Sequence, residues 1–156
     1  MNYQPINALA VAELHRTIYP APFAKVVAGR GKRRLGDHFG LTHFGVNLTQ
    51  LAPGAASALL HRHSLEDELV YIISGTAVLV IDGEEFSVNS GDCCGFKAGG
   101  GKAHHLLNRS DAPVSYLEIG NRAPGADQVE YPNDDLKLAT APDGSRFAAH
   151  KDGTPY

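Results

Sequence analysis

The sequence predicts an all-β protein of one domain, and three observations lead to this prediction. Short runs rich in β-branched and aromatic residues recur along the chain, separated by turn residues. The 156 residues include 17 glycines and 9 prolines, and helical periodicity is hard to find. Two of the runs, Thr76–Ile81 and Glu84–Val88, are joined by Asp82-Gly83, a strong signal for a tight hairpin. Short, evenly spaced strands of this kind are typical of an antiparallel barrel or sandwich.

The remaining strands are expected between similar turn signals. They are, in chain order, Thr42–Leu51, Ala58–His63, Glu68–Ile73, Cys93–Phe96, Ala103–Asn108 and Val114–Ile119. Pro53-Gly54 ends the first of them and Ser74-Gly75 the third, because these dipeptides favour turns. Within the first strand, Phe44, Val46 and Leu48 alternate and share one face.

The flanks of this core, which we place at residues 42–120, are less regular. The N-terminal arm, residues 1–41, is expected to be extended or to hold a short helix around Ala8–Arg16. Tyr19-Pro20-Ala21-Pro22 should end any helix there. The tail, residues 121–156, lacks a periodic apolar pattern and is expected to wrap around the barrel. No repeat or low-complexity linker suggests a second domain, so 1–156 is treated as one.

Composition excludes several classes of function. The formal charge of −3 and the absence of a basic stripe argue against nucleic-acid binding. No apolar run reaches the roughly 18–20 residues that a membrane span needs, and the first residues do not resemble a secretion signal. A cytoplasmic protein that acts on or binds a small molecule is expected. The adjacent Cys93 and Cys94 cannot easily pair with each other and are expected to be reduced.

Histidines provide the clearest chemical signal. In His61-Arg62-His63, a strand would place both imidazoles on one face. Glu68 opens the next strand, and His104 begins another after a glycine-rich break. Three imidazoles and one carboxylate suit a single Mn, Fe, Co, Ni or Zn ion with positions left open. Two alternatives stay open, His105 in place of His104 and Glu66 in place of Glu68, and the acidic residues beside Glu68 are also compatible with a plain solvated loop.

This spacing resembles the cupin family. A first motif runs from Gly54 to His61-Arg62-His63, then four residues to Glu68 and six more to Gly75. A second motif has Gly91, then Gly99, and then His104 followed by three residues and Asn108. The sequence departs from the family pattern in two places: six residues rather than five separate Gly54 from His61, and Lys97 stands where proline is usual. The whole chain also resembles a group of small bacterial single-domain cupins.

The resemblance implies a double-stranded β-helix, or jelly-roll, with a divalent transition metal inside it. It carries over His61, His63, Glu68 and His104 as ligands. Within the pair His104-His105, the three-residue gap to Asn108 selects His104. Asn108 is expected to serve the backbone of a neighbouring turn rather than the metal. The resemblance further implies a homodimer, in which the segment Phe23–Ala28 is expected to pair with or exchange into the partner.

Reaction type is less well indicated, because cupin metal centres support many reactions. The leading hypothesis is a small metalloenzyme with oxygenase chemistry, acting on an oxygenated organic molecule. Glu68 is then a ligand and also a candidate proton acceptor. Candidate pocket residues are the aromatic side chains Phe44, Tyr71, Phe96 and Tyr116. The alternatives are a metal-dependent isomerase, decarboxylase or lyase, and a non-catalytic barrel that binds a sugar or metabolite.

Overall fold

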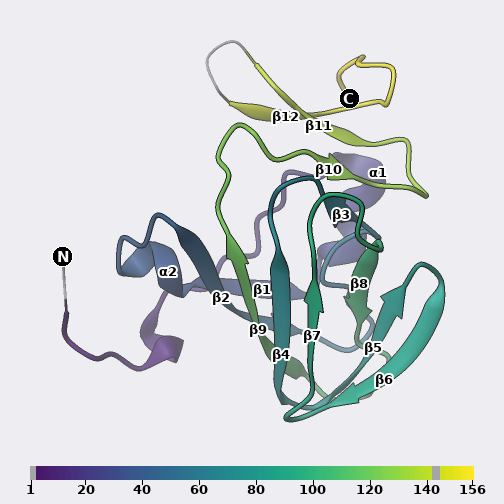
Figure 1. Cartoon of the computed structure of the whole chain (residues 1–156). Coiled ribbons are helices and arrows are strands. Elements are labelled where there is room, and N and C mark those ends of the chain that lie inside the picture. Colours follow the sequence, from purple (N-terminus) through teal and green to yellow (C-terminus); the bar gives the residue numbers. More distant parts are fainter. Residues whose placement is uncertain (1–2, 142–144) are drawn as a thin grey trace.

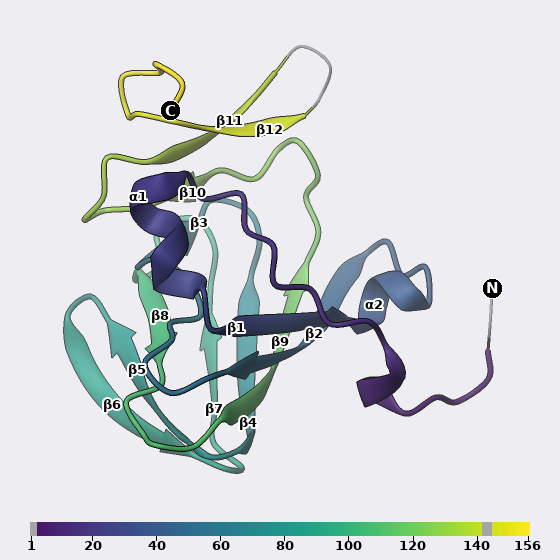
Figure 2. The same cartoon turned by 180° about the vertical axis from the view of Figure 1, so that it is seen from behind.

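Antiparallel sheets form a barrel in the computed structural model, which describes residues 3–141 and 145–156 (Figures 1 and 2). One sheet has the strand order β1-β2-β9-β4-β7, and a second has the order β6-β5-β8. Their bounds are Arg30–Arg34 (β1), Phe44–Leu51 (β2), Glu68–Ser74 (β4), Thr76–Ile81 (β5), Glu84–Asn89 (β6), Cys93–Phe96 (β7), His104–Leu107 (β8) and Val114–Asn121 (β9). This is the predicted all-β jelly-roll. The described residues include no helix long and apolar enough to span a membrane.

Both predicted turn signals at the second sheet form as expected. Asp82 and Gly83 join β5 to β6 with φ angles of 48° and 90°, as a two-residue hairpin of this type requires. Gly75 links β4 to β5 with φ +84°, and a Cβ atom there would lie 2.8 Å from the carbonyl oxygen of Pro113. Glycine is therefore needed at this corner for two independent reasons.

The flanks are more regular than predicted. The tail contributes β10 (Val129–Glu130), β11 (Lys137–Thr140) and β12 (Arg146–Ala149), which pair in the order β12-β11-β10-β3. This third sheet crosses one end of the barrel, at the top of Figure 1. Its strand β3 is only Arg62–His63, shorter than the predicted Ala58–His63. His61 lies outside this strand and forms an isolated bridge with His104. The bridge brings the imidazoles of His61 and His104 close together.

The proline-rich segment of the arm was predicted wrongly as the end of a helix. Helix α1 (Ala21–Ala24) begins directly after Pro20, and a 3₁₀ turn, η2 (Lys25–Val27), continues it. Proline fits the first helical turn because the missing N–H has no intrahelical partner there. The arm also holds a 3₁₀ turn, η1 (Ala8–Ala10), and a short helix, α2 (Leu35–His38).

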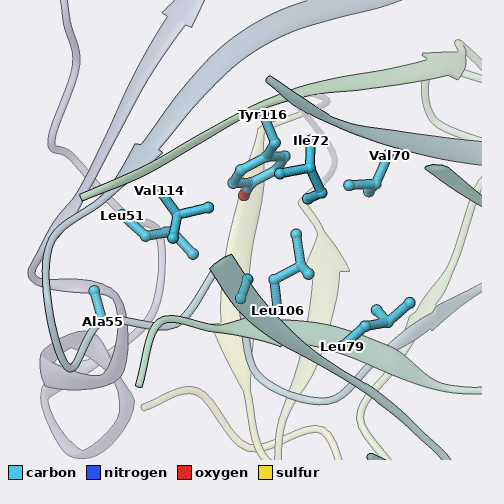
Figure 3. Packing of buried hydrophobic residues seen from close by; sticks show 9 residues of the cluster. Leu51, Ala55, Val70, Ile72, Leu79, Leu106, Val114 and Tyr116 are labelled. Atoms are coloured by element: carbon cyan, nitrogen blue, oxygen red, sulfur yellow. The ribbon is translucent and has the colours of Figure 1, made fainter. Parts of the chain in front are cut away.

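Buried apolar side chains gather in two clusters. The larger is shown in Figure 3 and contains Leu51, Ala55, Val70, Ile72, Ala77, Leu79, Leu106, Val114 and Tyr116. The smaller lies between α1 and the tail and contains Leu59, Tyr131 and Leu136, with Tyr19 and Phe23 packed against it. The clusters leave the middle of the barrel free for polar side chains.

Asn108 braces the turn between β8 and β9, as predicted. It is 1% exposed, and its amide nitrogen donates to the carbonyl oxygens of Leu51 at 2.9 Å and Ala112 at 2.8 Å. Its side-chain oxygen accepts from the backbone N–H of Ser110 at 3.0 Å. Removing the amide would take this donor from the buried carbonyl oxygen of Leu51, while the Ala112 carbonyl would keep the hydroxyl of Ser110.

We therefore expect Asn108→Ala to lower the free energy of unfolding by about 1–3 kcal/mol, because an unsatisfied buried group carries a desolvation penalty. Urea denaturation measures this loss. Asn89→Ala is the matched control, since the Asn89 side chain is exposed and accepts one bond from Thr76. An equal loss in the two variants would contradict the bracing role.

Candidate functional site

A cavity of about 540 Å³ lies inside the barrel. Its floor is formed by apolar residues of the larger cluster, namely Val70, Leu79, Leu106 and Tyr116. Above the floor the walls are polar. Its charged lining consists of Arg30, Lys32, Arg34, Asp37, Glu66, Asp67, Glu68, Glu118, Arg122 and Arg146. Such a cavity suits a small, highly polar molecule.

Three of the four predicted metal ligands, His61, Glu68 and His104, have donor atoms within 4.8 Å of one another at one wall of this cavity, and His63 reaches the same carboxylate from slightly farther away. Around the Oε2 atom of Glu68, the Nε2 atoms of the three histidines lie at 3.1 Å (His104), 3.8 Å (His61) and 4.0 Å (His63). Donor atoms bound to one ion at about 2.0–2.2 Å lie roughly 3 to 3.5 Å apart. The observed spacing is therefore close to that of a shared coordination sphere. Glu68 and His104 come from β4 and β8, and the other two from the segment that includes β3.

Hydrogen bonds at the far side of each ring orient the imidazoles. The Nδ1 atom of His61 lies 2.9 Å from the carbonyl oxygen of Leu59, and that of His63 lies 2.7 Å from the Oδ2 atom of Asp127. Both oxygens accept, so in the neutral ring the proton sits on Nδ1 and the Nε2 lone pair faces Glu68. Lone pairs that face a carboxylate oxygen repel it unless a cation lies between them. The donor set thus fits a divalent metal ion.

Electrostatics favour a neutral His61 and an ionised Glu68. Burial lowers the pKa of His61 to about 4, although Glu68 acts in the opposite sense. Burial raises the pKa of Glu68, but the hydrogen bond with His104, and the positive charge that the three histidines carry when protonated at low pH, outweigh it and lower the pKa to about 2. A neutral imidazole and an ionised carboxylate are the forms that bind metals.

These shifts predict how the stability of the metal-free protein depends on pH. Both pKa values are lower in the folded chain than their ordinary values of 6.5 for His61 and 4.5 for Glu68. The unfolded chain therefore binds more protons as the pH falls, and the folded state loses stability from about pH 6.5 downward. Urea denaturation in a chelator at pH 7.5 and pH 5 should show this loss, and His61→Gln should reduce it. An unchanged loss in that variant would contradict the assignment to His61.

Asp127, which sequence reasoning missed, supports this site from behind. Its Oδ1 atom accepts from the backbone N–H groups of Leu65 at 2.9 Å and Glu66 at 3.2 Å, while Oδ2 faces His63. These bonds and His63 lower the pKa of Asp127 despite its burial, which acts to raise it. No local motif links Asp127 to a histidine 64 positions earlier, so only the fold reveals the pair.

Asp127→Asn should weaken metal binding about 10–100-fold, the usual effect of losing a carboxylate behind a ligating histidine. Competition with a fluorescent chelator measures the affinity. Glu130→Gln is a matched control, because the Glu130 carboxylate pairs with Arg62 at 2.8 Å and neither residue lines the cavity. Equal affinities for Asp127→Asn and the unmodified protein would contradict the orienting role.

The structure separates the sequence alternatives for the ligands. His104 is 3% exposed and faces Glu68, whereas the Nδ1 atom of His105 lies 3.1 Å from the carbonyl oxygen of Ala58. Glu66 accepts from the backbone N–H of Ala123 at 2.8 Å. It also belongs to a second group of possible metal-binding side chains, with His63 and Asp127.

The four aromatic pocket candidates occupy three different environments. Tyr116 lies on the cavity floor, and burial raises the pKa of its hydroxyl. Phe96 stacks on the ring of His104 with 3.4 Å between the ring centres. Phe44 and Tyr71 are 44% and 42% exposed, and these two residues and Phe96 are all outside the cavity lining.

A polar group on β1, β2 and β9 contributes to the cavity wall next to the ligands. The Oε1 atom of Glu118 accepts from Lys32 Nζ at 2.6 Å and from Asn47 Nδ2 at 3.1 Å. Across β9 and β4, Glu118 pairs with Val70, which is two positions from Glu68. Glu118 and Glu68 are therefore diagonal neighbours on one face, and their backbones lie roughly 7–8 Å apart. Sequence reasoning missed this group, although a glutamate within the apolar strand Val114–Ile119 was a signal.

Comparisons with known proteins agree with this geometry. Residues 47–120 match the family model described as a cupin domain. A crystal structure of a sugar phosphate isomerase of the cupin superfamily from Silicibacter pomeroyi is 35% identical, covers 98% of this chain and 96% of its own, and superposes with a TM-score of 0.90. A putative sugar phosphate isomerase from Acidithiobacillus ferrooxidans is 31% identical over 83% of this chain and 82% of its own, with a TM-score of 0.71.

A curated relative is matched over a shorter stretch. An uncharacterized protein from Methanocaldococcus jannaschii is 36% identical over 42 residues, which span 27% of this chain and about a third (34%) of that protein. The nearly full-length likeness to the Silicibacter pomeroyi structure, with the same superfamily's domain model over β2 to β9, shows the relationship: this chain belongs to the cupin superfamily.

Proposed function

We propose that the protein is a metal-dependent isomerase that interconverts an aldose and a ketose, with a sugar phosphate as substrate. The observation that carries the proposal is the pairing of two kinds of group in one cavity. Imidazole and carboxylate donors meet at Glu68, and a separate carboxylate, Glu118, lies diagonally across from them. The relatives named above as sugar phosphate isomerases favour this class among the metal-dependent reactions of the superfamily.

His61, His63, Glu68 and His104 are the residues that would hold one divalent transition metal. When bound, such an ion supplies polarisation of the sugar's carbonyl and adjacent hydroxyl oxygens. Zn, Fe, Mn, Ni and Co all suit three imidazoles and a carboxylate. Glu68 is then engaged as a ligand, and a proton acceptor separate from it is required.

Glu118 is suited to that second task. In the aldose-to-ketose direction, its carboxylate takes the proton from C2, and the C2–H electron pair forms the double bond of an enediol. The same carboxylate returns the proton to C1, while a hydroxyl proton passes from the C2 oxygen to the C1 oxygen. The composition of the substrate does not change. Lys32 and Asn47 hold Glu118 in place, which general acid–base catalysis requires.

Turnover assays on the protein reconstituted with each metal test the proposal. A panel of pentose and hexose phosphates should include one whose aldose and ketose forms are interconverted. Oxygen consumption with diketones, flavonols and catechols distinguishes the isomerase from an oxygenase, the alternative that stays a prediction. Oxygen uptake without isomerisation would overturn the proposed class. Ligand binding without any turnover would instead favour a non-catalytic sugar-binding barrel.

A homodimer also remains a proposal. The outer face of β4 exposes Leu69, Tyr71 and Ile73 by 41–42% each, and an exposed apolar sheet face of this kind is typical of an interface. The segment Phe23–Ala28, predicted to reach a partner, begins with Phe23 packed against the smaller cluster of its own chain. Light scattering after size exclusion measures the assembly, and Tyr71→Glu should shift a dimer towards the monomer.

A further inference from the structure

We infer that Arg30 and Arg146 form a subsite for the phosphate group of the substrate. Both guanidinium groups line the cavity, one from β1 and the other from β12 of the tail. The sugar part of the ligand rests on the proposed function. The anion site itself does not, because it follows from charge and position alone.

The pairing of the other cavity cations sets these two arginines apart. Lys32 pairs with Glu118 at 2.6 Å, and both Arg34 and Arg122 pair with Asp37. Arg30 instead donates to a neutral acceptor, the carbonyl oxygen of Ser57, at 2.5 Å. Among the residues that the structure describes, neither Arg30 nor Arg146 has a carboxylate within salt-bridge distance. A guanidinium that lines a cavity and pairs with no carboxylate of the described residues is suited to bind an anionic ligand.

Two tyrosines line the same cavity as the arginines and His61. Tyr131 is buried and hydrogen-bonds with Tyr19. Burial raises the pKa of Tyr131, while the positive charges of Arg146 and Arg30 act to lower it, and all three residues line the same cavity. The ring of Tyr131 is also 6.2 Å from the ring of His61. A phosphate held by the arginines would thus lie at the His61 side of the donor group.

Charge balance indicates a phosphate ester rather than a carboxylate ligand. The cavity lining contains five Lys or Arg residues and five Asp or Glu residues, so their formal charges cancel when the histidines are neutral. A bound divalent ion leaves an excess of two positive charges. A phosphate monoester carries about −1.5 to −2 at neutral pH and matches this excess, and a planar guanidinium can contact two of its oxygens at once.

Isothermal titration calorimetry with inorganic phosphate, glucose 6-phosphate and glucose tests the inference on the metal-loaded protein. We expect the two phosphate compounds to bind, and Arg146→Gln and Arg30→Lys each to weaken them about tenfold or more, since charge-assisted bonds of this kind are strong. Arg30→Lys keeps the charge and removes the two-pronged geometry. Arg109→Gln is the matched control, because Arg109 is exposed and pairs with Glu85 on the β5–β6 hairpin.

The outcomes separate this inference from the proposed function. Phosphate binding that is weakened in both cavity variants but not in Arg109→Gln supports the subsite, even if no isomerase activity is found. Isomerase activity on unphosphorylated sugars, with no phosphate binding, would overturn the subsite and leave the proposed reaction intact. Equal phosphate affinity in the unmodified protein and Arg146→Gln would also overturn it. Arg146 is exposed, so this variant remains informative if Arg30→Lys folds poorly.

Discussion

Replacing His104 with alanine is expected to reduce bound metal from about one equivalent to less than about 0.1, because losing a ligand has a larger effect than the 10–100-fold loss seen for residues behind the ligands. The Nε2 atom of His104 is the nearest imidazole nitrogen to Glu68, at 3.1 Å. The side chain is buried, so water cannot readily take its place in the same geometry. Mass spectrometry of the protein after reconstitution and desalting measures the content.

The neighbouring residue supplies a matched control for this experiment. His105→Ala removes the same side chain one position along β8, where the ring faces the carbonyl oxygen of Ala58 instead of Glu68. It should keep its metal. Because His104 also stacks on Phe96, His61→Ala is a second ligand variant that leaves this stack in place. Full metal content in both ligand variants, or loss in His105→Ala alone, would contradict the ligand assignment.

Sequence reasoning succeeded where the determining contacts are local. Asp82 and Gly83 specify their hairpin through their own backbone angles. His61 and His63 share a direction because they are two positions apart, although the regular strand there is only Arg62–His63. Asn108 bonds to a carbonyl group four residues away. Each of these relations is encoded in a short stretch and survives small changes in strand length.

The groups that sequence reasoning missed depend on contacts between distant strands. Glu118 meets Lys32 only because β2 lies between β1 and β9, where Asn47 pairs with Glu118 and Thr49 pairs with Lys32. The alternation along β2 was visible, but its apolar face with Phe44 is the outer one, and Asn47 on the other face lines the cavity. Because this barrel encloses a polar site, the usual expectation that apolar residues face inward fails along that part of the strand.

The tail illustrates the same limit. Each of its strands is only two to four residues long, which is too short for a periodic apolar pattern to be recognised. They form because β10 pairs with β3, which aligns Val129 with His63. Asp127, just before β10, is brought to His63 by this pairing. The segment with the weakest pattern therefore both supports a predicted metal ligand, His63, and supplies Arg146 to the cavity.

The second large effect is expected for Glu118→Gln, which should lower kcat for sugar phosphate isomerisation about 10²–10⁴-fold, the usual contribution of a general acid–base group. Glutamine keeps the size of the side chain but cannot accept the proton from carbon. Metal content should not change, because Glu118 is not among the donors at Glu68. Exchange of the C2 hydrogen with D₂O, followed by NMR, should be lost in parallel with turnover.

Two further variants separate proton transfer from a structural effect. Glu85→Gln makes the same substitution at an exposed carboxylate on the outer hairpin and should leave kcat unchanged. Lys32→Met removes the 2.6 Å partner of Glu118 while the carboxylate stays, so it should lower kcat less than Glu118→Gln does. If Glu118→Gln retained both turnover and exchange, the proton would have to be carried by another group. Glu68, the proton acceptor that the sequence suggested, would then be the carboxylate to test, because it is the other one on the inward face of the β4–β9 pair.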